Sequence, residues 1–187
     1  MTPMLPAPPL LPGLVLNVPR RFGDDRGEFR EVWNATRVVE TGLPPTFVQV
    51  NHSRSIRNTL RGLHFQRRHP QGKLVSVIAG AILDVAVDLR AGSETFGRHV
   101  SMELSAANGR QLYLPPGFAH GFWALSDLAE VIYLATDFYR PEDEGAVCWD
   151  DPTLGIAWPA DAAPLLSPKD AAAPRLASLQ AADLPFA

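Results

Sequence analysis

Cysteine and long apolar runs are scarce in this sequence, and each shortage limits what the protein can be. The 187 residues include one cysteine, Cys148, which excludes an internal disulfide and fits a reducing compartment. No run approaches the ~20 consecutive apolar residues that cross a bilayer, so we expect no membrane contact. Residues 1–13 are rich in proline and lack a basic start followed by an apolar stretch, so we interpret them as a tail rather than a signal peptide. The expected location is therefore the cytoplasm.

Acidic residues are absent between positions 54 and 73, although the formal charge of the whole chain is -3. The cations of this window are Arg54, Arg57, Arg61, Arg67, Arg68 and Lys73. A local cationic stretch in an acidic protein indicates a small anionic ligand, because nucleic-acid binders spread positive charge over a whole face. His64 lies inside the window and suggests proton transfer beside that anion, since imidazole changes charge near neutral pH. A buried histidine next to a solvated arginine cluster explains the same stretch equally well.

Short apolar segments punctuated by Gly, Pro, Asn and Ser make up most of the chain. The clearest period-2 alternation covers residues 82–89, where Leu83, Val85 and Val87 share one face and Asp84 and Asp88 share the other. The expected strands cover residues 14–18, 29–33, 47–53, 60–66, 73–79, 82–89, 98–104, 111–114, 119–125 and 130–136. So many short strands predict an all-β sandwich or barrel, formed by one domain over residues 14–187.

Turn and helix signals are few. Residues 24–27 have acidic residues before a glycine and predict a turn. Asn34 is expected to cap a short helix that ends at Gly42, and a second short helix is expected in the Ala-rich C-terminal part.

Residues 109–120 resemble the second half of the cupin signature, which has a glycine, five residues and then P-x-G-x-x-H, here ending at His120. Metal-binding cupins carry H-x-H and then a glutamate in the first half. Here His64 is followed by Gln66, and Lys73 stands where the glutamate is expected. A metal site needs several converging lone-pair donors, and an ammonium group offers none. We therefore expect a cupin-type barrel with a fixed positive charge in place of the metal, and no cofactor.

Several further motifs extend the resemblance from the fold to one family within it. They are FGDDRG (22–27), QVN (49–51), LRGLHFQ (60–66), QGKLV (71–75), DVAVDLR (84–90), PPGFAHGF (115–122) and SPKD (167–170). In order and spacing they are similar to the dTDP-4-dehydrorhamnose 3,5-epimerase family. The resemblance implies a cupin double-stranded β-helix, or jelly roll, with short peripheral helices. It also implies a homodimer, the absence of a metal, and a dTDP-4-keto-6-deoxyglucose substrate.

The resemblance implies a role for each candidate catalytic residue. His64 would be the base, and Asp170 would orient its other ring nitrogen. Tyr133 would be the acid on the opposite face of the sugar; without the resemblance, a core tyrosine would be the preferred interpretation. Lys73 would stabilise the enolate oxygen.

The resemblance also implies the substrate-binding residues. Arg61 would pair with the pyrophosphate, where a guanidinium can bind two oxygens, and Phe138 would stack on the base. The remaining sugar-nucleotide contacts would be Gln49, Asn51, His120, Glu144, Lys73 and Lys169. The contacts from the partner subunit would be Phe22, Arg26 and Glu31. No role is assigned to His52, His69 and His99.

The sequence leaves one geometric conflict open. An ideal strand would put Arg61 and His64 on opposite faces, so either a bulge brings them together or Arg61 precedes the strand.

Three competing functions are also compatible with parts of the sequence. A relative that inverts only carbon 3 or only carbon 5 would have the same base and acid. A metal cupin would have the same barrel, but Gln66 and Lys73 argue against it. An inactive sugar-nucleotide-binding module would keep the binding residues, but the intact set of catalytic residues argues against it.

Overall fold

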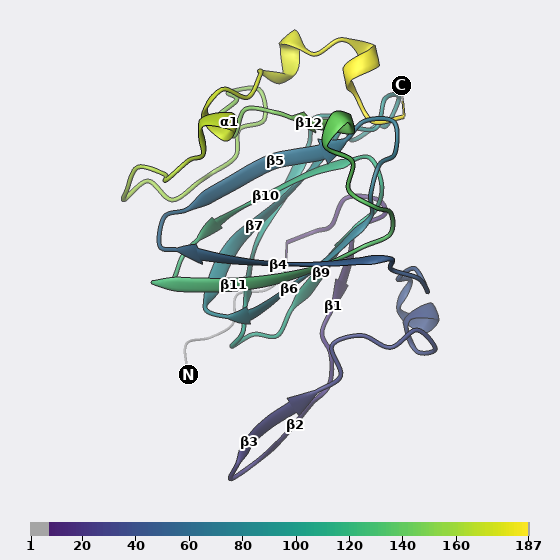
Figure 1. Ribbon diagram of the computed structural model, residues 1–187, viewed down its shortest axis with the longest axis vertical. Coiled ribbons are helices and arrows are strands. Elements are labelled where there is room, and N and C mark those ends of the chain that lie inside the picture. The colour runs from purple at the N-terminus through teal and green to yellow at the C-terminus, as the bar shows by residue number, and fades with distance from the viewer. Residues whose placement is uncertain (1–7, 187) are drawn as a thin grey trace.

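A computed structural model describes residues 8–186, and over this range the strands form two five-stranded antiparallel sheets and a separate hairpin (Figure 1). The first sheet has the order β1 (Val15–Asn17), β9 (Gln111–Leu114), β6 (Lys73–Ala79), β11 (Leu128–Ala135) and β4 (Gln49–Ile56). The second has the order β12 (Glu144–Ala146), β5 (Leu60–Gln66), β10 (Phe118–Ala124), β7 (Ala81–Asp88) and β8 (His99–Ser105). The expected cupin-type jelly roll is confirmed.

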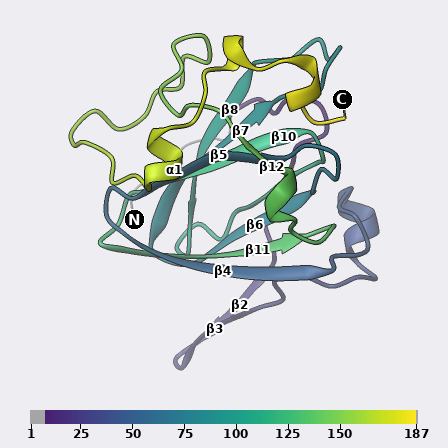
Figure 2. The same cartoon turned by 45° about the horizontal axis from the view of Figure 1, so that its top comes forward.

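The two sheets face each other, and their inner faces form the main core (Figure 2). Val75 and Leu112 of the first sheet pack in one buried cluster with Ile82, Leu104 and Phe122 of the second. This apolar packing fills only part of the space between the sheets. The remainder is lined by polar side chains and forms the cavity described below.

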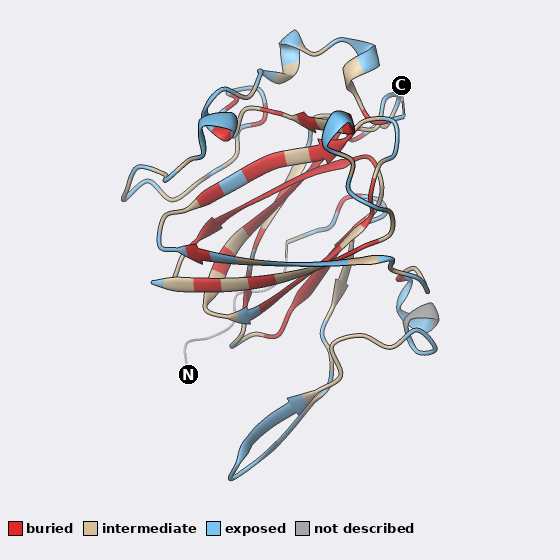
Figure 3. Ribbon diagram, in the orientation of Figure 1, coloured by how far each residue is buried: buried red, intermediate tan, exposed pale blue. Residues whose placement is uncertain are grey.

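Part of the outer face of each sheet is also covered, which explains why the central strands are red along most of their length in Figure 3. On β7 the predicted alternation is confirmed, but its apolar face points outward. Val85 and Val87 pack there against Trp158 and Leu179 of the C-terminal segment, while Ile82 and Ala86 point into the barrel. Asp84, which lies between Ile82 and Ala86 on β7, therefore also points into the barrel.

The hairpin of β2 (Arg21–Asp24) and β3 (Gly27–Arg30) projects away from the barrel and is exposed (Figure 3). Its turn confirms the one predicted at residues 24–27. The strand predicted at residues 29–33 is present with different bounds, because pairing with β2 makes β3 begin at Gly27 and end at Arg30.

The helix predicted from Asn34 to Gly42 was wrong, since the structure has only the 3-10 turn η1 (Val38–Thr41). Asn34 does begin a turn, and its side-chain oxygen accepts a hydrogen bond from the Thr36 amide at 3.0 Å. The backbone amides that follow then bond to carbonyls three residues earlier, as in Arg37 to Asn34 and Glu40 to Arg37. This pattern closes tight turns rather than an α-helix.

The C-terminal part contains the predicted short helix, α1 (Pro168–Ala171), and two 3-10 turns, η3 (Leu176–Ser178) and η4 (Ala181–Asp183). A further turn, η2 (Pro141–Asp143), precedes β12, a strand that the sequence did not predict because three residues carry no period. Residues 1–7 of the proposed tail lie outside the described range, and its described end packs on the barrel, where Leu11 is buried. In the part of the chain that the structure describes, no helix has the length and apolarity to span a membrane.

Candidate active site

A bulge in β5 puts Arg61 and His64 on the same side of the strand. The pairing with β10 shifts, so that the three-residue step from Arg61 to His64 lies opposite a two-residue step. Gly62 permits this shift, because its φ is +122° and a Cβ there would lie 2.5 Å from the Cα of Gly121. The conflict between an ideal strand and a shared site is therefore resolved by the bulge.

Both side chains reach a cavity of about 350 Å³ between the two sheets. The predicted site residues that line it are Asn51, Arg61, His64, Lys73, His120, Tyr133, Glu144, Lys169 and Asp170. Residues that the sequence did not single out for the site also line it, among them Ser53 and Gln71. The cavity thus gathers side chains from both sheets and from the C-terminal segment.

Asp170 reaches His64 from the other end of the chain, and its Oδ1 lies 2.5 Å from the His64 Nε2. Helix α1 holds Asp170 in place, because the Ser167 hydroxyl accepts a hydrogen bond from the Asp170 amide and donates one to Oδ2 at 2.9 Å. Burial alone would raise the pKa of Asp170, but the hydrogen bonds from His64 and Ser167 outweigh it and lower the pKa. Asp170 is therefore a carboxylate at neutral pH, able to orient the imidazole and to stabilise its cation.

Tyr133 lies on β11 in the sheet that faces His64, so the two side chains come from opposite walls of the cavity. Its hydroxyl is 3.0 Å from the Ser53 Oγ, and its ring packs edge-on against His120 at 5.9 Å between centroids. Burial raises the pKa of Tyr133 well above its ordinary value, and the Ser53 hydrogen bond opposes this shift. The phenol is therefore protonated at neutral pH and can act as a proton donor.

Lys73 begins β6, the strand next to β11, and lines the same cavity. Burial lowers the pKa of its ammonium group to about 8, although Glu144 and Asp84 pull in the opposite direction. Most of the population therefore carries a positive charge at pH 7, in a partly desolvated position where that charge acts strongly on a neighbouring oxygen.

His120 is held by a second buried carboxylate, Asp84, whose Oδ1 lies 2.7 Å from the His120 Nε2. Both side chains are almost fully buried. The sequence assigned His120 to substrate contact and Asp84 only to one motif, so the partnership of the two residues was missed. The signal was present in β7, because the period-2 pattern puts Asp84 on the face that points into the barrel.

The mouth of the cavity is formed around Glu144 on β12. Glu144 makes an ion pair with Lys169 and accepts a hydrogen bond from the Tyr139 hydroxyl at 2.7 Å. Burial would raise the pKa of Glu144, but Lys169 and Tyr139 together lower it. Glu144 is thus an anion that fixes two neighbouring side chains at the mouth.

Gln49 and Phe138 lie beside this mouth rather than in the cavity lining. Gln49 donates to the Asn51 Oδ1 at 2.9 Å and accepts from the Tyr139 amide at 2.9 Å. Phe138 precedes Tyr139 and is 57% exposed. A flat aromatic ring so exposed at the mouth is available for stacking on a planar ligand.

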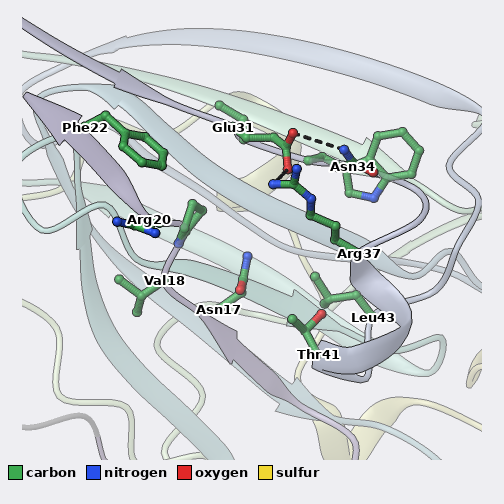
Figure 4. A pocket seen from close by; sticks show the side chains of 12 residues that line it. Asn17, Val18, Arg20, Phe22, Glu31, Asn34, Arg37, Thr41 and Leu43 are labelled. Carbon is green, nitrogen blue, oxygen red and sulfur yellow. Dashed lines mark hydrogen bonds and ion pairs between the residues drawn. The ribbon is translucent and has the colours of Figure 1, made fainter.

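Phe22, Glu31 and Arg26 are not brought to this cavity within one chain. Phe22 and Glu31 line a separate cavity of about 300 Å³ near η1, where Glu31 binds Asn34 and Arg37 (Figure 4). Arg26 lies at the tip of the hairpin and pairs with Asp24. Their predicted contribution to a neighbouring subunit's site stays a prediction.

The three histidines without an assigned role lie outside the cavity lining. His52 is 3.4 Å from Glu130, and His69 is 3.3 Å from the buried Asp143. Burial lowers the pKa of His99. Over residues 8–186, no three His, Cys, Asp or Glu side chains are grouped so that they could hold a metal ion.

Sequence and structure comparisons agree with this geometry. The sequence model of the family described as dTDP-4-dehydrorhamnose 3,5-epimerase matches residues 9–178. The dTDP-4-dehydrorhamnose 3,5-epimerase of Pseudomonas aeruginosa is 55% identical over 161 residues, which cover 86% of this chain and 89% of that protein. A 3′-monoepimerase from Streptomyces bikiniensis, in complex with dTDP-quinovose, is 39% identical with a TM-score of 0.83, and the match covers 88% of this chain and 84% of that chain.

The crystal structure of the dTDP-6-deoxy-D-glucose-3,5-epimerase of Legionella pneumophila contains dTDP-4-keto-L-rhamnose. It is 49% identical to this chain, with a TM-score of 0.90 over 94% of each chain. The similarity spans the barrel and the C-terminal segment that carries Asp170, and this chain belongs to the dTDP-4-dehydrorhamnose 3,5-epimerase family.

Proposed function

We propose that this enzyme inverts carbons 3 and 5 of dTDP-4-keto-6-deoxy-D-glucose and so forms dTDP-4-keto-L-rhamnose. It would act in the cytoplasm, in the synthesis of dTDP-L-rhamnose or a related deoxysugar. The observation that best supports this proposal is one cavity with a His64–Asp170 pair on one wall, Tyr133 on the facing wall and Lys73 beside it.

The chemistry requires two groups on opposite faces of the sugar. The ketone at carbon 4 acidifies the hydrogens on carbons 3 and 5, so a base can remove one and leave an enolate. Inversion then requires a proton from the other face. His64, oriented by Asp170, takes the first proton, and Tyr133 returns one from the opposite wall.

Lys73 stabilises the enolate between these two transfers. A preorganised donor at a developing oxyanion contributes on the order of 3 kcal/mol, or roughly a hundredfold in rate. The ammonium group is well suited to this role, because burial strengthens its field while the pKa of about 8 keeps it charged at neutral pH.

The rest of the cavity and the residues beside its mouth bind the nucleotide part of the substrate. Arg61 pairs with the pyrophosphate, and Phe138 at the exposed mouth stacks on the thymine. The remaining sugar-nucleotide contacts come from Gln49, Asn51, His120, Glu144 and Lys169. Phe22, Arg26 and Glu31 come from the partner subunit, so the active unit is a homodimer with shared sites.

The proposed function is tested by incubating the protein with dTDP-4-keto-6-deoxyglucose in deuterated water and following label and configuration by NMR. Label and inversion at both carbons are expected, in chelator as well as in untreated buffer. The similarity to a 3′-monoepimerase supplies the second candidate, for which only carbon 3 would be inverted. No label at either carbon contradicts both candidates, and activity lost on removal of a stoichiometric metal contradicts the metal-free mechanism.

A further inference from the structure

Tyr133 must regain a proton after every transfer, and a 3,5-epimerase makes two transfers per product. The phenol sits in a largely desolvated part of the cavity, where its anion is strongly disfavoured. A hydroxyl that is already hydrogen-bonded to the phenol is the nearest source of that proton. This inference deepens the proposed function and rests on Tyr133 acting as the acid.

Ser53 is the neighbour that meets the requirement. Its Oγ lies 3.0 Å from the Tyr133 hydroxyl, and either oxygen can be the donor. Like Tyr133, Ser53 is partly buried and lines the cavity, and it lies on β4, the edge strand of the first sheet. Its hydrogen bond and the positive charge of Arg61 both favour the phenolate against the effect of burial.

The inner face of β4 gives two serines different partners. Ser53 contacts the phenol, while Ser55, two residues on and on the same face, accepts a hydrogen bond from the Arg61 Nε at 3.0 Å. The outward residues His52 and Arg54 pair instead with Glu130. Ser53 is therefore placed for the acid, and Ser55 for the anion-binding arginine.

We propose that Ser53 positions Tyr133 and relays protons to it from water in the cavity. When Tyr133 gives its proton to the substrate carbon, the phenolate oxygen takes the hydroxyl proton of Ser53. The Ser53 oxygen then takes a proton from water, and the hydroxide is neutralised by the proton that His64 releases. The cycle consumes no net proton, and it prepares Tyr133 for the second inversion.

The kinetic test compares Ser53→Ala, Ser53→Thr and the matched control Ser55→Ala. A hydrogen bond to a charged group predicts that Ser53→Ala lowers the kcat for inversion roughly 10- to 100-fold. Deuterium exchange by His64 with retention should continue, and the singly inverted sugar should accumulate. Ser53→Thr, which keeps a hydroxyl, should restore most of the rate. Ser55→Ala should raise KM, because it removes the hydrogen bond that the Arg61 Nε donates to Ser55.

Three kinetic results would overturn the relay. Ser53→Ala could invert at the wild-type rate, or it could lose exchange and inversion by the same factor. A loss that Ser53→Thr does not restore would assign Ser53 to packing.

A measurement without substrate separates failure of the relay from failure of the proposed function. The chain has three tyrosines, Tyr113, Tyr133 and Tyr139, so incorporated 3-fluorotyrosine gives signals that single Tyr→Phe variants assign in ¹⁹F NMR. Ser53→Ala should raise the pKa of the Tyr133 signal and leave the other two unchanged. An unchanged Tyr133 titration would contradict the contact itself, whatever reaction the enzyme catalyses.

Discussion

Replacing Asp170 by Asn tests the base end of the mechanism, because it removes the charge and leaves the shape. In the wild type, Asp170 accepts from the His64 Nε2 at 2.5 Å and from the Ser167 hydroxyl at 2.9 Å. An amide can accept only with its oxygen. The Ser167 hydroxyl can rotate and accept from the amide nitrogen, so the oxygen of Asn stays available to His64.

The structure therefore predicts that kcat falls only because the negative charge is lost. A hydrogen bond to a charged group contributes about 1.5–3 kcal/mol, which converts to roughly a 10- to 150-fold fall in kcat. In a Ser-His-Asp triad the corresponding change costs about 10⁴, because there Asn imposes the wrong imidazole tautomer. The loss of kcat expected for Asp170→Asn is smaller because the Ser167 hydroxyl can rotate and accept a hydrogen bond from the Asn amide nitrogen.

The assay follows deuterium exchange and inversion by NMR under single-turnover conditions, so that product release does not mask the chemistry. Both rates should fall together, since both begin with proton removal by His64. The double variant Ser167→Ala with Asp170→Asn shows whether the hydroxyl was needed for the milder loss. A loss near 10⁴ in Asp170→Asn would contradict the adaptable hydroxyl, and no loss would remove Asp170 from the mechanism.

Four further outcomes are expected. Tyr133→Phe should let deuterium enter with retention while inversion falls about 10²–10⁴-fold, and His64→Asn should abolish both; near wild-type inversion in Tyr133→Phe would make that residue a packing group. Mixing Arg26→Ala and His64→Asn chains should restore some activity, and no recovery after demonstrated subunit exchange would count against a shared site. The kcat should fall above about pH 8 as Lys73 loses its charge, and Lys73→Gln should lose about a hundredfold in kcat together with this alkaline limb. The buried Asp88 accepts from Arg90, Ser93 and Thr95, so Asp88→Asn should lower the free energy of unfolding by about 3 kcal/mol in denaturant titrations. These bonds lower the pKa of Asp88 despite its burial, so its contribution to the free energy of unfolding is complete above about pH 4 and is lost as the pH falls further. The free energy of unfolding of Asp88→Asn should therefore lack this dependence on pH.

Most strands of the barrel and part of the site could be predicted from the sequence. Residues 60–66 and 73–79 were predicted as strands and form β5 and β6 with the same bounds, because short apolar segments between turn-forming residues are a local signal. That signal also placed His64 and Lys73 on strands, and the motifs around them carried the family resemblance. The cation in the expected metal-ligand position was equally visible, since it depends only on residue type and spacing.

Contacts between distant groups were not readable from local patterns: the His64–Asp170 pair was predicted only through the family resemblance, and the Ser53–Tyr133 contact was not predicted. Asp170 lies 106 positions from His64, and Ser53 lies 80 from Tyr133. No periodicity connects such positions, because their contact depends on how the C-terminal segment returns to the barrel and on which strand pairs with β11. The bulge at Gly62 could not be predicted from the sequence either. The register between β5 and β10 is fixed by cross-strand packing and not by the alternation of either strand.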